Sequence, residues 1–529
     1  MFRKLVSLLL AAVMALSLAT PALAEGNFNE TGLPIVNEPI TLKIAATRHA
    51  NDATASFNEK HAIIQAAKET NINIEWIEIT NGDADSVAVL LAGDMPDVFL
   101  GNLLSDSIIQ ENSSMFLVLN DLIETYCPNV YSLYENDFDG WRNFLTYPDG
   151  NIYGLAGQFL ESKTGSMRGV QWINKAWLDR LNLAVPTTID ELYNVLVAFR
   201  DNDANGNGDA TDEIPMNFSQ SHNESDLWNF MTSWGIPGYY DIVDGKVLPT
   251  MDTETFRSFL EFCHKLVDEK LLNVEGLTST QEQYTAELDS MRTGTFFGWG
   301  PFTFITAGEN QKEFVEMAPA SANGIKPRIM QLSNTAYRNC FVVNANSPYT
   351  KEALRLWDYL SQDQHFARYV CRGEDGLIYK LAEDGVYYSN TPTAEEMIAL
   401  GYEDYVSSIG TSTLNASLGL TLCSPLQLYM YTSEDPSTTT GVRRLGVKAC
   451  EPYFMEQVMP KGIVPADVQE EYDFATEGLL EMIDQFIASS VLNGVTDEAW
   501  NAYLKDLSNL GYDYYIDWNQ SYFNGDFVK

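Results

Sequence analysis

An acidic, asparagine-rich loop at residues 201–215 is the stretch whose residue types and spacing most clearly suggest chemistry. It reads DNDANGNGDATDEIP, and oxygen-bearing side chains recur at every second position from Asp201 to Asp209. Hard cations such as Ca²⁺ take six to eight oxygen ligands, often from one loop with glycine at its sharp turn. The loop therefore predicts a calcium site, with a solvated acidic turn as the alternative.

Two registers of the calcium-loop pattern D-x-[DN]-x-[DN]-G fit this loop. One begins at Asp203 and reaches its glycine at position 208, and the acids that close it come early, at 212 and 213. The other begins at Asp201 and places Asp212 at the twelfth position. Pro215 disfavours a helix directly after the loop. We therefore expect a calcium loop outside a paired helix-loop-helix sensor, with the register left open by the spacing.

A second candidate site is aromatic. Residues 296–302 read FFGWGPF and place Trp299 between two glycines, while Trp234 and Tyr239 occur together in another glycine-containing stretch. Sugars present apolar C–H faces that stack on exposed rings, while their hydroxyls meet amides and carboxylates. A tryptophan is often a core residue instead. The glycines flanking Trp299 favour a loop position and a stacking role.

The elements expected to position these residues alternate between strands and helices. Strands are predicted at 40–45, 72–79 and 98–100, and helices at 55–68 and 86–91. This order predicts an α/β sheet with parallel strands, in which ligands lie beyond the carboxyl ends. His49 follows the first strand and Asn102 the third, so both are candidates for a binding site. The alternation slips at Ile77, which predicts either a bulge or a buried strand end.

A second α/β unit is predicted to begin near Val170. Thr187 or Thr188 can cap a helix with an apolar face, and Asp252 or Thr253 can open another. Cys263 falls on the apolar face of that second helix, which indicates a buried thiol. A last helix is predicted over 500–510, with Gly511 at its carboxyl-terminal cap.

The first 24 residues have the pattern of a secretory signal peptide: two basic residues, an apolar run and Ala-Leu-Ala at the end. We expect cleavage after Ala24 and a soluble mature chain, 25–529, outside the cytoplasm. No cysteine follows the apolar run, so no lipid-attachment site is expected. The formal net charge of −41 repels nucleic acid and anionic membranes, which excludes both as partners.

Motifs of catalysis are scarce in this chain. It contains no H-E-x-x-H, G-x-S-x-G or phosphate-binding G-x-x-x-x-G-K-[ST] sequence, and it has five histidines. The six cysteines are widely spaced, and none forms a C-x-x-C pair, so neither a zinc ribbon nor a small disulfide scaffold is predicted. A binding protein is therefore favoured over an enzyme.

Several stretches together resemble the extracytoplasmic solute-binding proteins of carbohydrate ABC transporters, and specifically the calcium-loop branch that includes alginate-binding proteins. The matching stretches run in family order across nearly all of the mature chain: residues 93–98 (GDMPDV), 147–155 (YPDGNIYGL), 177–183 (WLDRLNL), 186–192 (PTTIDEL), the loop 203–215, and the tail 497–500 (DEAW) through 510–513 (LGYD). Each stretch is weak alone, and their order gives the resemblance its specificity.

The resemblance implies a type II periplasmic-binding-protein fold of the α/β class, with two lobes joined by crossover strands and a solute cleft between them. It places 25–160 and about 335–400 in the N-terminal lobe, and about 161–334 and 401–529 in the C-terminal lobe. Within that frame we expect a carbohydrate-binding cleft formed by His49, Asn102, Trp234, Tyr239, Trp299 and Tyr153. Trp299 is the preferred stacking platform.

The resemblance also implies that the acidic loop binds structural Ca²⁺ in the second lobe, away from the solute. This favours the register that begins at Asp203. The implied ligands are Asp203, Asn205, Asn207, Asp209 through its backbone carbonyl, Asp212 and Glu213. One extra residue precedes Asp212 compared with the commoner spacing, and the lipid-attachment cysteine of many relatives is missing.

The function implied is that of a monomeric, non-enzymatic carrier, secreted to the cell envelope, that delivers a sugar or oligosaccharide to the permease subunits of an ABC transporter. The alternatives are a secreted polysaccharide-active enzyme, because a fold can carry an unrelated active site, and a receptor that binds without transport.

Overall fold

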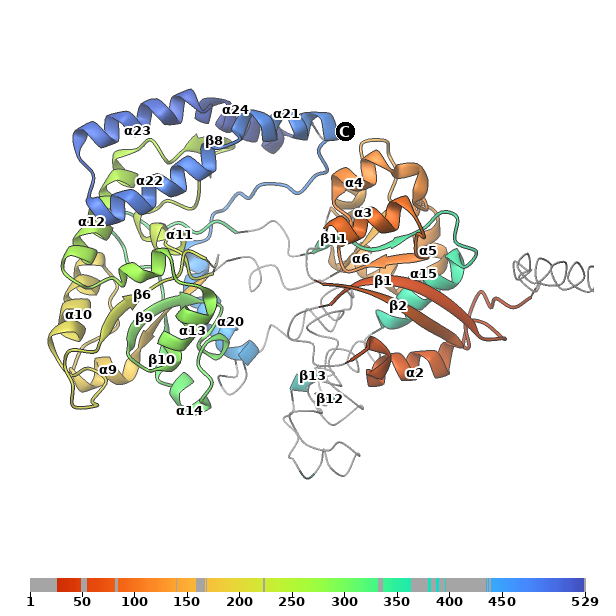
Figure 1. Ribbon diagram of the computed structural model, residues 1–529, viewed down its shortest axis with the longest axis horizontal. Helices are drawn as coiled ribbons and strands as arrows, with labels where there is room; N and C mark the ends of the chain where they lie inside the picture. The colour runs from red at the N-terminus through yellow and green to blue at the C-terminus, as the bar shows by residue number, and fades with distance from the viewer. Residues whose placement is uncertain are drawn as a thin grey trace, which may run out of the picture.

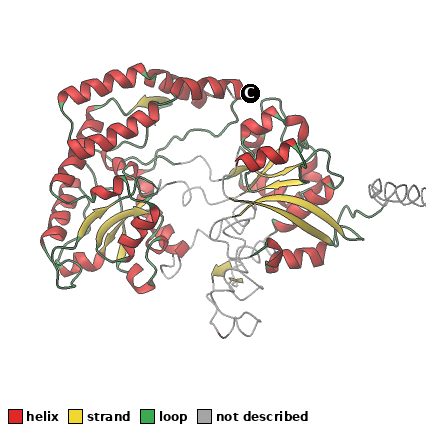
Figure 2. Ribbon diagram, viewed as in Figure 1, coloured by secondary structure: helices red, strands yellow, loops and turns green. Residues whose placement is uncertain are grey.

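The computed structural model separates into two lobes, each built around its own β-sheet (Figure 1). It describes residues 26–48, 55–80, 84–138, 140–157, 167, 169–221, 224–331, 336–362, 379–381, 387–389, 395, 434, 436 and 439–527. Helices flank the sheet of each lobe (Figure 2). His49 and the predicted signal peptide lie outside the described residues.

The N-terminal lobe contains a five-stranded sheet in the order β2-β1-β3-β11-β4. Its strands are β1 (Ile40–Arg48), β2 (Ile72–Thr80), β3 (Val98–Leu100), β4 (Gly154–Gly157) and β11 (Tyr337–Val343). Its helices are α2 (His61–Thr70), α3 (Ala84–Ala92), α4 (Asp106–Glu111), α5 (Leu122–Tyr126), α6 (Pro128–Asp137), α7 (Trp141–Leu145) and α15 (Thr350–Leu360). β11 comes from far along the chain and pairs antiparallel with both β3 and β4. The chain therefore returns to this lobe after building the other.

The predicted strands of this lobe are present, and each of the first two is slightly longer than expected. β1 and β2 pair in parallel from Ile40 opposite Ile72 to Arg48 opposite Thr80, without a register shift. Ile77 lies within this continuous register, opposite Ala45, so of the two alternatives the bulge is absent, and Ile79 near the end of the strand is buried. The helix expected over 55–68 is instead a short 3-10 turn at Phe57–Glu59 followed by α2.

The C-terminal lobe contains a four-stranded sheet in the order β10-β5-β9-β6 and a separate hairpin. The strands are β5 (Val170–Asn174), β6 (Ile214–Asn217), β9 (Thr293–Gly298) and β10 (Phe314–Met317), with β7 (Tyr240–Val243) and β8 (Lys246–Pro249) in the hairpin. The helices are α9 (Lys175–Arg180), α10 (Ile189–Asp201), α11 (Trp228–Met231), α12 (Glu254–Asp268), α13 (Gln281–Asp289), α14 (Gly308–Gln311), α20 (Thr439–Cys450), α21 (Ala466–Thr476), α22 (Leu479–Asn493), α23 (Asp497–Asn509) and α24 (Tyr512–Asn524). A further pair, β12 (Tyr379–Leu381) and β13 (Tyr387–Ser389), forms a two-stranded sheet of its own.

The helix starts predicted in this lobe follow from capping. The Thr188 hydroxyl accepts from the Glu191 N–H while the Glu191 carboxylate accepts from the Thr188 N–H, which is a complete capping box. Thr253 caps α12 by accepting from the Phe256 N–H. Cys263 is fully buried on the apolar face of α12, as its spacing indicated, and burial raises the pKa of its thiol. Leu510 is the carboxyl-terminal cap of α23, and Gly511, the next residue, has the left-handed backbone expected after a helix end.

A strap, residues 453–466, runs from the C-terminal lobe to the N-terminal lobe beside the connection that leads into β11. Met455 N–H donates to the Ile329 carbonyl at 3.0 Å, and the Arg338 guanidinium donates to the Lys461 carbonyl at 2.9 Å. Ile463 is buried among apolar residues of the N-terminal lobe, and the Gln110 amide bonds the strap backbone on either side of residue 465. The predicted lobe boundaries stay a prediction. They assign all of 401–529 to the C-terminal lobe, whereas Ile463 of the strap packs on the N-terminal lobe.

Lys461 on the strap gives a pH prediction. Burial, followed by the nearby charge of Arg338, lowers the pKa of Lys461 to about 8. The unfolded chain therefore binds more protons than the folded one between pH 8 and about 10.5, so this residue makes stability rise with pH there. We expect Lys461→Met to be more stable than the wild type by about 1–2 kcal/mol at pH 7, after a discount for partial exposure.

Urea unfolding of both proteins at pH 7 and pH 10 measures this effect. The difference in unfolding free energy between Lys461→Met and the wild type should shrink at pH 10, where the wild-type amine is neutral in the folded state. Other titratable groups are common to both proteins and cancel in the difference. An advantage that is the same at both pH values would contradict a buried, charged Lys461.

Candidate functional site

The carboxyl ends of β1, β3 and β4 lie at one edge of the N-terminal sheet. β1 and β3 are parallel, and β11 is antiparallel to both β3 and β4. Tyr337, the first residue of β11, therefore lies at this edge, opposite Gly157 at the end of β4. The chain leaves the lobe after Gly157 and re-enters at Tyr337, so this edge faces the other lobe (Figure 1).

Two side chains at this edge are exposed. Asn102 follows β3 with a left-handed backbone, φ 58°, and is exposed. Tyr337 is 50% exposed although it is a large aromatic residue. The sequence reasoning missed Tyr337, because a tyrosine before a β-rich run looks the same whether its ring is buried or free. Its position adds an aromatic side chain to the N-terminal side of the candidate site.

The matching edge of the C-terminal sheet carries Trp299. β6 and β9 are parallel, and β5 is antiparallel to β9, so the ends of β6 and β9 and the start of β5 share one edge. The chain arrives from the N-terminal lobe at this edge, just before Val170. Trp299 directly follows β9 and is half-buried. The expected platform is therefore at an edge of its lobe that is joined directly to the other lobe.

The two glycines beside Trp299 have a packing role that the sequence did not reveal. A Cβ on Gly298 would lie 2.4 Å from the ring of Phe304, and a Cβ on Gly300 would lie 2.3 Å from the ring of Phe302. Side chains at these positions would clash, so the glycines let two phenylalanines pack closely on the backbone around Trp299. The glycines beside Trp299 therefore serve packing, and the stacking role of Trp299 stays a prediction.

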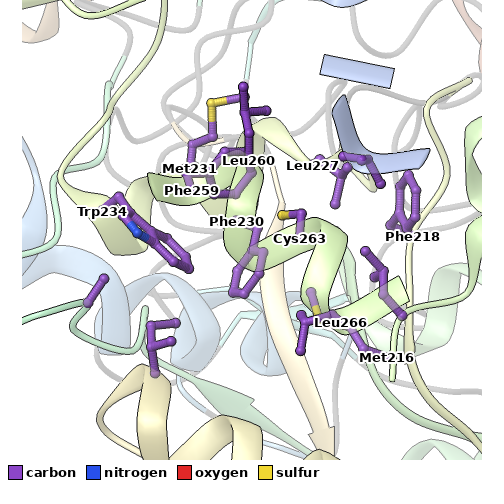
Figure 3. Close-up of a cluster of buried hydrophobic side chains, with 14 of the residues drawn as sticks. Met216, Phe218, Leu227, Phe230, Met231, Trp234, Phe259, Leu260, Cys263 and Leu266 are labelled. Carbon is purple, nitrogen blue, oxygen red and sulfur yellow. The ribbon is translucent and has the colours of Figure 1, made fainter. Parts of the chain in front are cut away.

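Trp234 is in the core and not at an edge of the sheet. It is 2% exposed, and its ring contacts those of Phe230, Phe259 and Phe262 at centroid distances of 5.2–5.3 Å. Figure 3 shows Trp234 among the apolar side chains of this cluster. The short turn after α11 points the indole at α12, which leaves it no open face for a sugar. Trp234 is therefore a core residue, which was the alternative considered for tryptophans in the sequence analysis.

Tyr153 and Tyr239 also lie elsewhere. Tyr153 precedes β4, so it is at the opposite edge from Gly157; it is 4% exposed, and its hydroxyl donates to the Asp149 carboxylate. Burial, followed by that hydrogen bond, raises the pKa of Tyr153. Tyr239 is half-buried, with its ring 4.3 Å from that of Trp228 and its hydroxyl 3.4 Å from Asp484 on α22. Tyr153 is therefore buried away from the edge that carries Asn102 and Tyr337, and Tyr239 packs against helices of the C-terminal lobe.

The acidic loop joins α10 to β6, at the amino end of β6. Trp299 follows the carboxyl end of the parallel strand β9, so the loop and the platform lie at opposite edges of one sheet. Asp201 is the last residue of α10, and its carboxylate pairs with Arg200. Asp203 instead turns into the loop and accepts from the Gly206 and Gly208 N–H groups at 2.7 and 2.9 Å. These contacts favour the register that begins at Asp203.

The other loop side chains present oxygens and amides in the same small region. Asn205 and Asn207 donate to the two carboxylate oxygens of Asp212 at 3.1 and 3.0 Å. Glu213 accepts from the Ala204 N–H through Oε1, while its Oε2 is buried and has no hydrogen-bond partner. Burial, with a smaller contribution from the charge of Asp212, raises the pKa of Glu213. Asp209 bonds Thr211 and not the other loop acids.

This donor set fits a hard cation in its chemistry. A buried carboxylate oxygen without a partner is costly unless a donor or a cation satisfies it. The amide oxygens of Asn205 and Asn207 accept from the Asn207 and Asp209 N–H groups at 2.9 and 2.7 Å, and amide oxygens are ligands that Ca²⁺ takes in proteins. Within the described chain, no group of three or more His, Cys, Asp or Glu side chains is gathered closely enough to hold a metal ion. A cation here would thus depend on amide and backbone oxygens as well as on acids.

Comparison with known proteins finds one matching family model, described as bacterial extracellular solute-binding protein, over residues 51–365. The curated fructooligosaccharide ABC transporter substrate-binding protein FusA of Streptococcus pneumoniae serotype 4 is 30% identical over 254 residues, 46% of this chain and 47% of FusA. The match thus spans about half the length of that relative. None of the helices in the described ranges is long and apolar enough to cross a membrane.

Solved structures share the fold over nearly the whole chain. An HMO-binding solute-binding protein associated with an ABC transporter, from Bifidobacterium longum infantis, has a TM-score of 0.77 at 22% identity, covering 93% of this chain and 100% of that one. A FusA EF-hand mutant in complex with fructo-nystose has a TM-score of 0.77 at 21% identity, covering 92% and 99%. Alginate-binding AlgQ2 without calcium ion has a TM-score of 0.62 at 18% identity, covering 92% and 99%. The predicted two-lobed α/β fold is confirmed.

Proposed function

The chain belongs to the family of bacterial extracellular solute-binding proteins, and on this premise we propose that it captures a sugar or oligosaccharide between its lobes and delivers it to an ABC transporter permease. The observation that carries the proposal is the half-buried indole of Trp299 at the edge of the C-terminal sheet. Members of this family bind solutes and are not enzymes. We therefore look for a surface that binds a solute and not for catalytic groups.

The arrangement of the two edges supports closure on a ligand. Asn102 and Tyr337 are exposed at the edge of the N-terminal sheet, and Trp299 lies at the corresponding edge of the C-terminal sheet. A solute that touches both edges only when the lobes are closed shifts the population toward the closed form. An aromatic ring provides stacking area, and the Asn102 amide offers both a donor and an acceptor to hydroxyls.

The relatives support a carbohydrate as the solute. FusA is named for fructooligosaccharides, and the similar solved structures are described as HMO-binding and alginate-binding proteins. We extend the proposal to an oligosaccharide ligand and to a monomer that works outside the cytoplasm with permease subunits. The identity of the sugar is the part that an experiment must supply.

We also propose that the acidic loop binds Ca²⁺ with a structural role. The ligands would be Asp203, Asn205, Asn207, the carbonyl of Asp209, Asp212 and Glu213, and the partnerless Oε2 of Glu213 supports this. The similar FusA structure is described as an EF-hand mutant, and the AlgQ2 structure as being without calcium ion. Bound calcium would neutralise the acids that join α10 to β6, and so stabilise the C-terminal lobe.

A thermal-shift screen tests the sugar proposal. Purified protein is heated with fructooligosaccharides, milk oligosaccharides, uronate oligomers and simple sugars, because a ligand that binds the folded state raises the melting temperature. We expect at least one oligosaccharide class to raise it in a saturable way, confirmed by calorimetry, and to be recovered uncut afterwards. A panel with no binder would argue against carbohydrate capture, and cleaved product would indicate an enzyme.

A further inference from the structure

Arg443 is a fully buried arginine whose guanidinium lies against the candidate platform. It belongs to the first half of α20, which packs across β5 and β10. Its exposed fraction is 0%, and it is among the largest fully buried side chains of the described chain. Charged side chains are seldom buried to this extent unless they are held by specific partners. The contacts of Arg443 therefore indicate what it is placed to do.

The guanidinium stacks on one face of the Trp299 indole. Its central carbon is 3.7 Å from the ring centroid, within the range of a cation–π contact. The same group donates to the Trp299 carbonyl at 3.3 Å and to the Met167 carbonyl at 2.8 Å. Arg443 thus holds both the backbone and the ring of residue 299, and it joins them to the end of the first crossover between the lobes.

The surroundings explain why the ring needs this contact. The Trp299 backbone is already fixed by Phe304 packed on Gly298 and by Phe302 packed on Gly300. Packing at these glycines does not fix the side-chain rotamer of Trp299, and the indole is only half-buried. A planar guanidinium against one face restricts that rotamer, and part of the half-buried indole stays exposed.

We propose that Arg443 is a positioning residue for sugar binding, which orients the Trp299 indole and leaves one face of it available for stacking. The inference rests on the proposed carbohydrate function. It identifies a residue that acts through Trp299 and not by contact with the sugar. Arg443 could not be identified from the sequence, because it lies 144 positions away from Trp299 along the chain.

The first test needs no ligand. The fluorescence of Trp299 is isolated by subtraction: the spectrum of a protein that carries Trp299→Phe is subtracted from that of the same protein with Trp299. Its emission maximum and its quenching by acrylamide are then compared between the wild type and Arg443→Lys. Arg443→Lys keeps a positive charge but loses the planar stacking surface. We expect the Trp299 emission to shift to longer wavelength and its quenching to increase about twofold in Arg443→Lys. Identical Trp299 signals in both backgrounds would overturn the proposal.

The second test is a double-mutant cycle with the sugar found in the thermal-shift screen. We expect Arg443→Lys to weaken binding about tenfold, and Arg443→Lys with Trp299→Ala to bind no more weakly than Trp299→Ala alone. Losses that multiply in the double variant would show that Arg443 contacts the sugar itself, and this outcome overturns the positioning role. A loss with Arg443→Lys but none with Trp299→Ala would also overturn it.

Arg444→Lys is the matched control. Arg444 is the next residue of α20, but its guanidinium pairs with Glu451 and not with Trp299. We expect this variant to bind sugar within twofold of the wild type and to leave the Trp299 emission unchanged. If Arg444→Lys reproduces the effects of Arg443→Lys, the cause is general disturbance of α20, and the proposal falls. Failure of the whole chain to bind any sugar would instead remove the proposed function and leave the emission test valid.

Discussion

Removal of calcium is expected to lower the melting temperature of the protein by about 10 °C. At a calcium concentration about a thousandfold above the dissociation constant, a site present only in the folded state stabilises by ~4 kcal/mol. For a folding unit of this size, each kcal/mol corresponds to roughly 2–4 °C. The measurement is a thermal melt with calcium and with a chelator. The order of preference among sugars should be unchanged, because the loop and Trp299 lie at opposite edges of the sheet.

Two substitutions make this prediction specific to the loop. Glu213→Gln removes the charge of the carboxylate whose Oε2 is buried without a partner, so its melting temperature should lose most of its response to calcium. Asp201→Asn is the control, because Asp201 pairs with Arg200 outside the loop contacts, and it should keep the full response. If chelation abolished sugar binding while the melting temperature stayed the same, the structural role of the loop would be wrong.

Loss of the Trp299 ring is expected to weaken sugar binding by about 1–3 kcal/mol, which is roughly five- to 150-fold in the dissociation constant. Trp299→Ala removes the stacking face, whereas Trp299→Phe keeps a smaller aromatic face and should lose less. Folding stability should change little, since the indole is only half-buried. Calorimetric titration with the sugar found by screening, together with a urea unfolding curve, measures both quantities.

Trp234 provides the contrast for this prediction. Its ring is 2% exposed in the core, so truncation to alanine should cost ~3–5 kcal/mol of folding stability. Trp299→Ala should therefore affect sugar binding, whereas Trp234→Ala should affect folding stability. Unchanged sugar affinity in an intact Trp299→Ala protein would exclude Trp299 from the binding site.

Local sequence signals were reliable where the cause is local. The alternation at 72–79 predicted β2, and the Thr188 and Thr253 hydroxyls start α10 and α12 as expected, because capping depends on residues within one turn. The acidic loop could likewise be recognised from spacing alone, and its backbone contacts favour the register that begins at Asp203. These features depend on a few neighbouring residues, and the sequence contains all of them.

The choice among the aromatic residues could not be made in the same way. Trp234, Tyr239 and Trp299 all lie near glycine, yet one ring is in the core, one lies against C-terminal helices, and one stands at an edge of the sheet. What separates them is which distant segment covers each ring, namely α12 for Trp234, α22 and α24 for Tyr239, and Arg443 of α20 for one face of Trp299. Such coverage is a property of long-range packing.

The resemblance to the family, the alternation of strands and helices, and the composition of the acidic loop could all be recognised from the sequence, because they depend on residue order and short-range spacing. Long-range packing sets which edge of each sheet faces the other lobe. It places Tyr153 at the edge opposite Gly157, and it brings Tyr337 and Arg443 to the candidate site. The physical reason is strand pairing between distant segments. β11 enters the first sheet after the second lobe is built, and its pairing brings Tyr337 opposite Gly157.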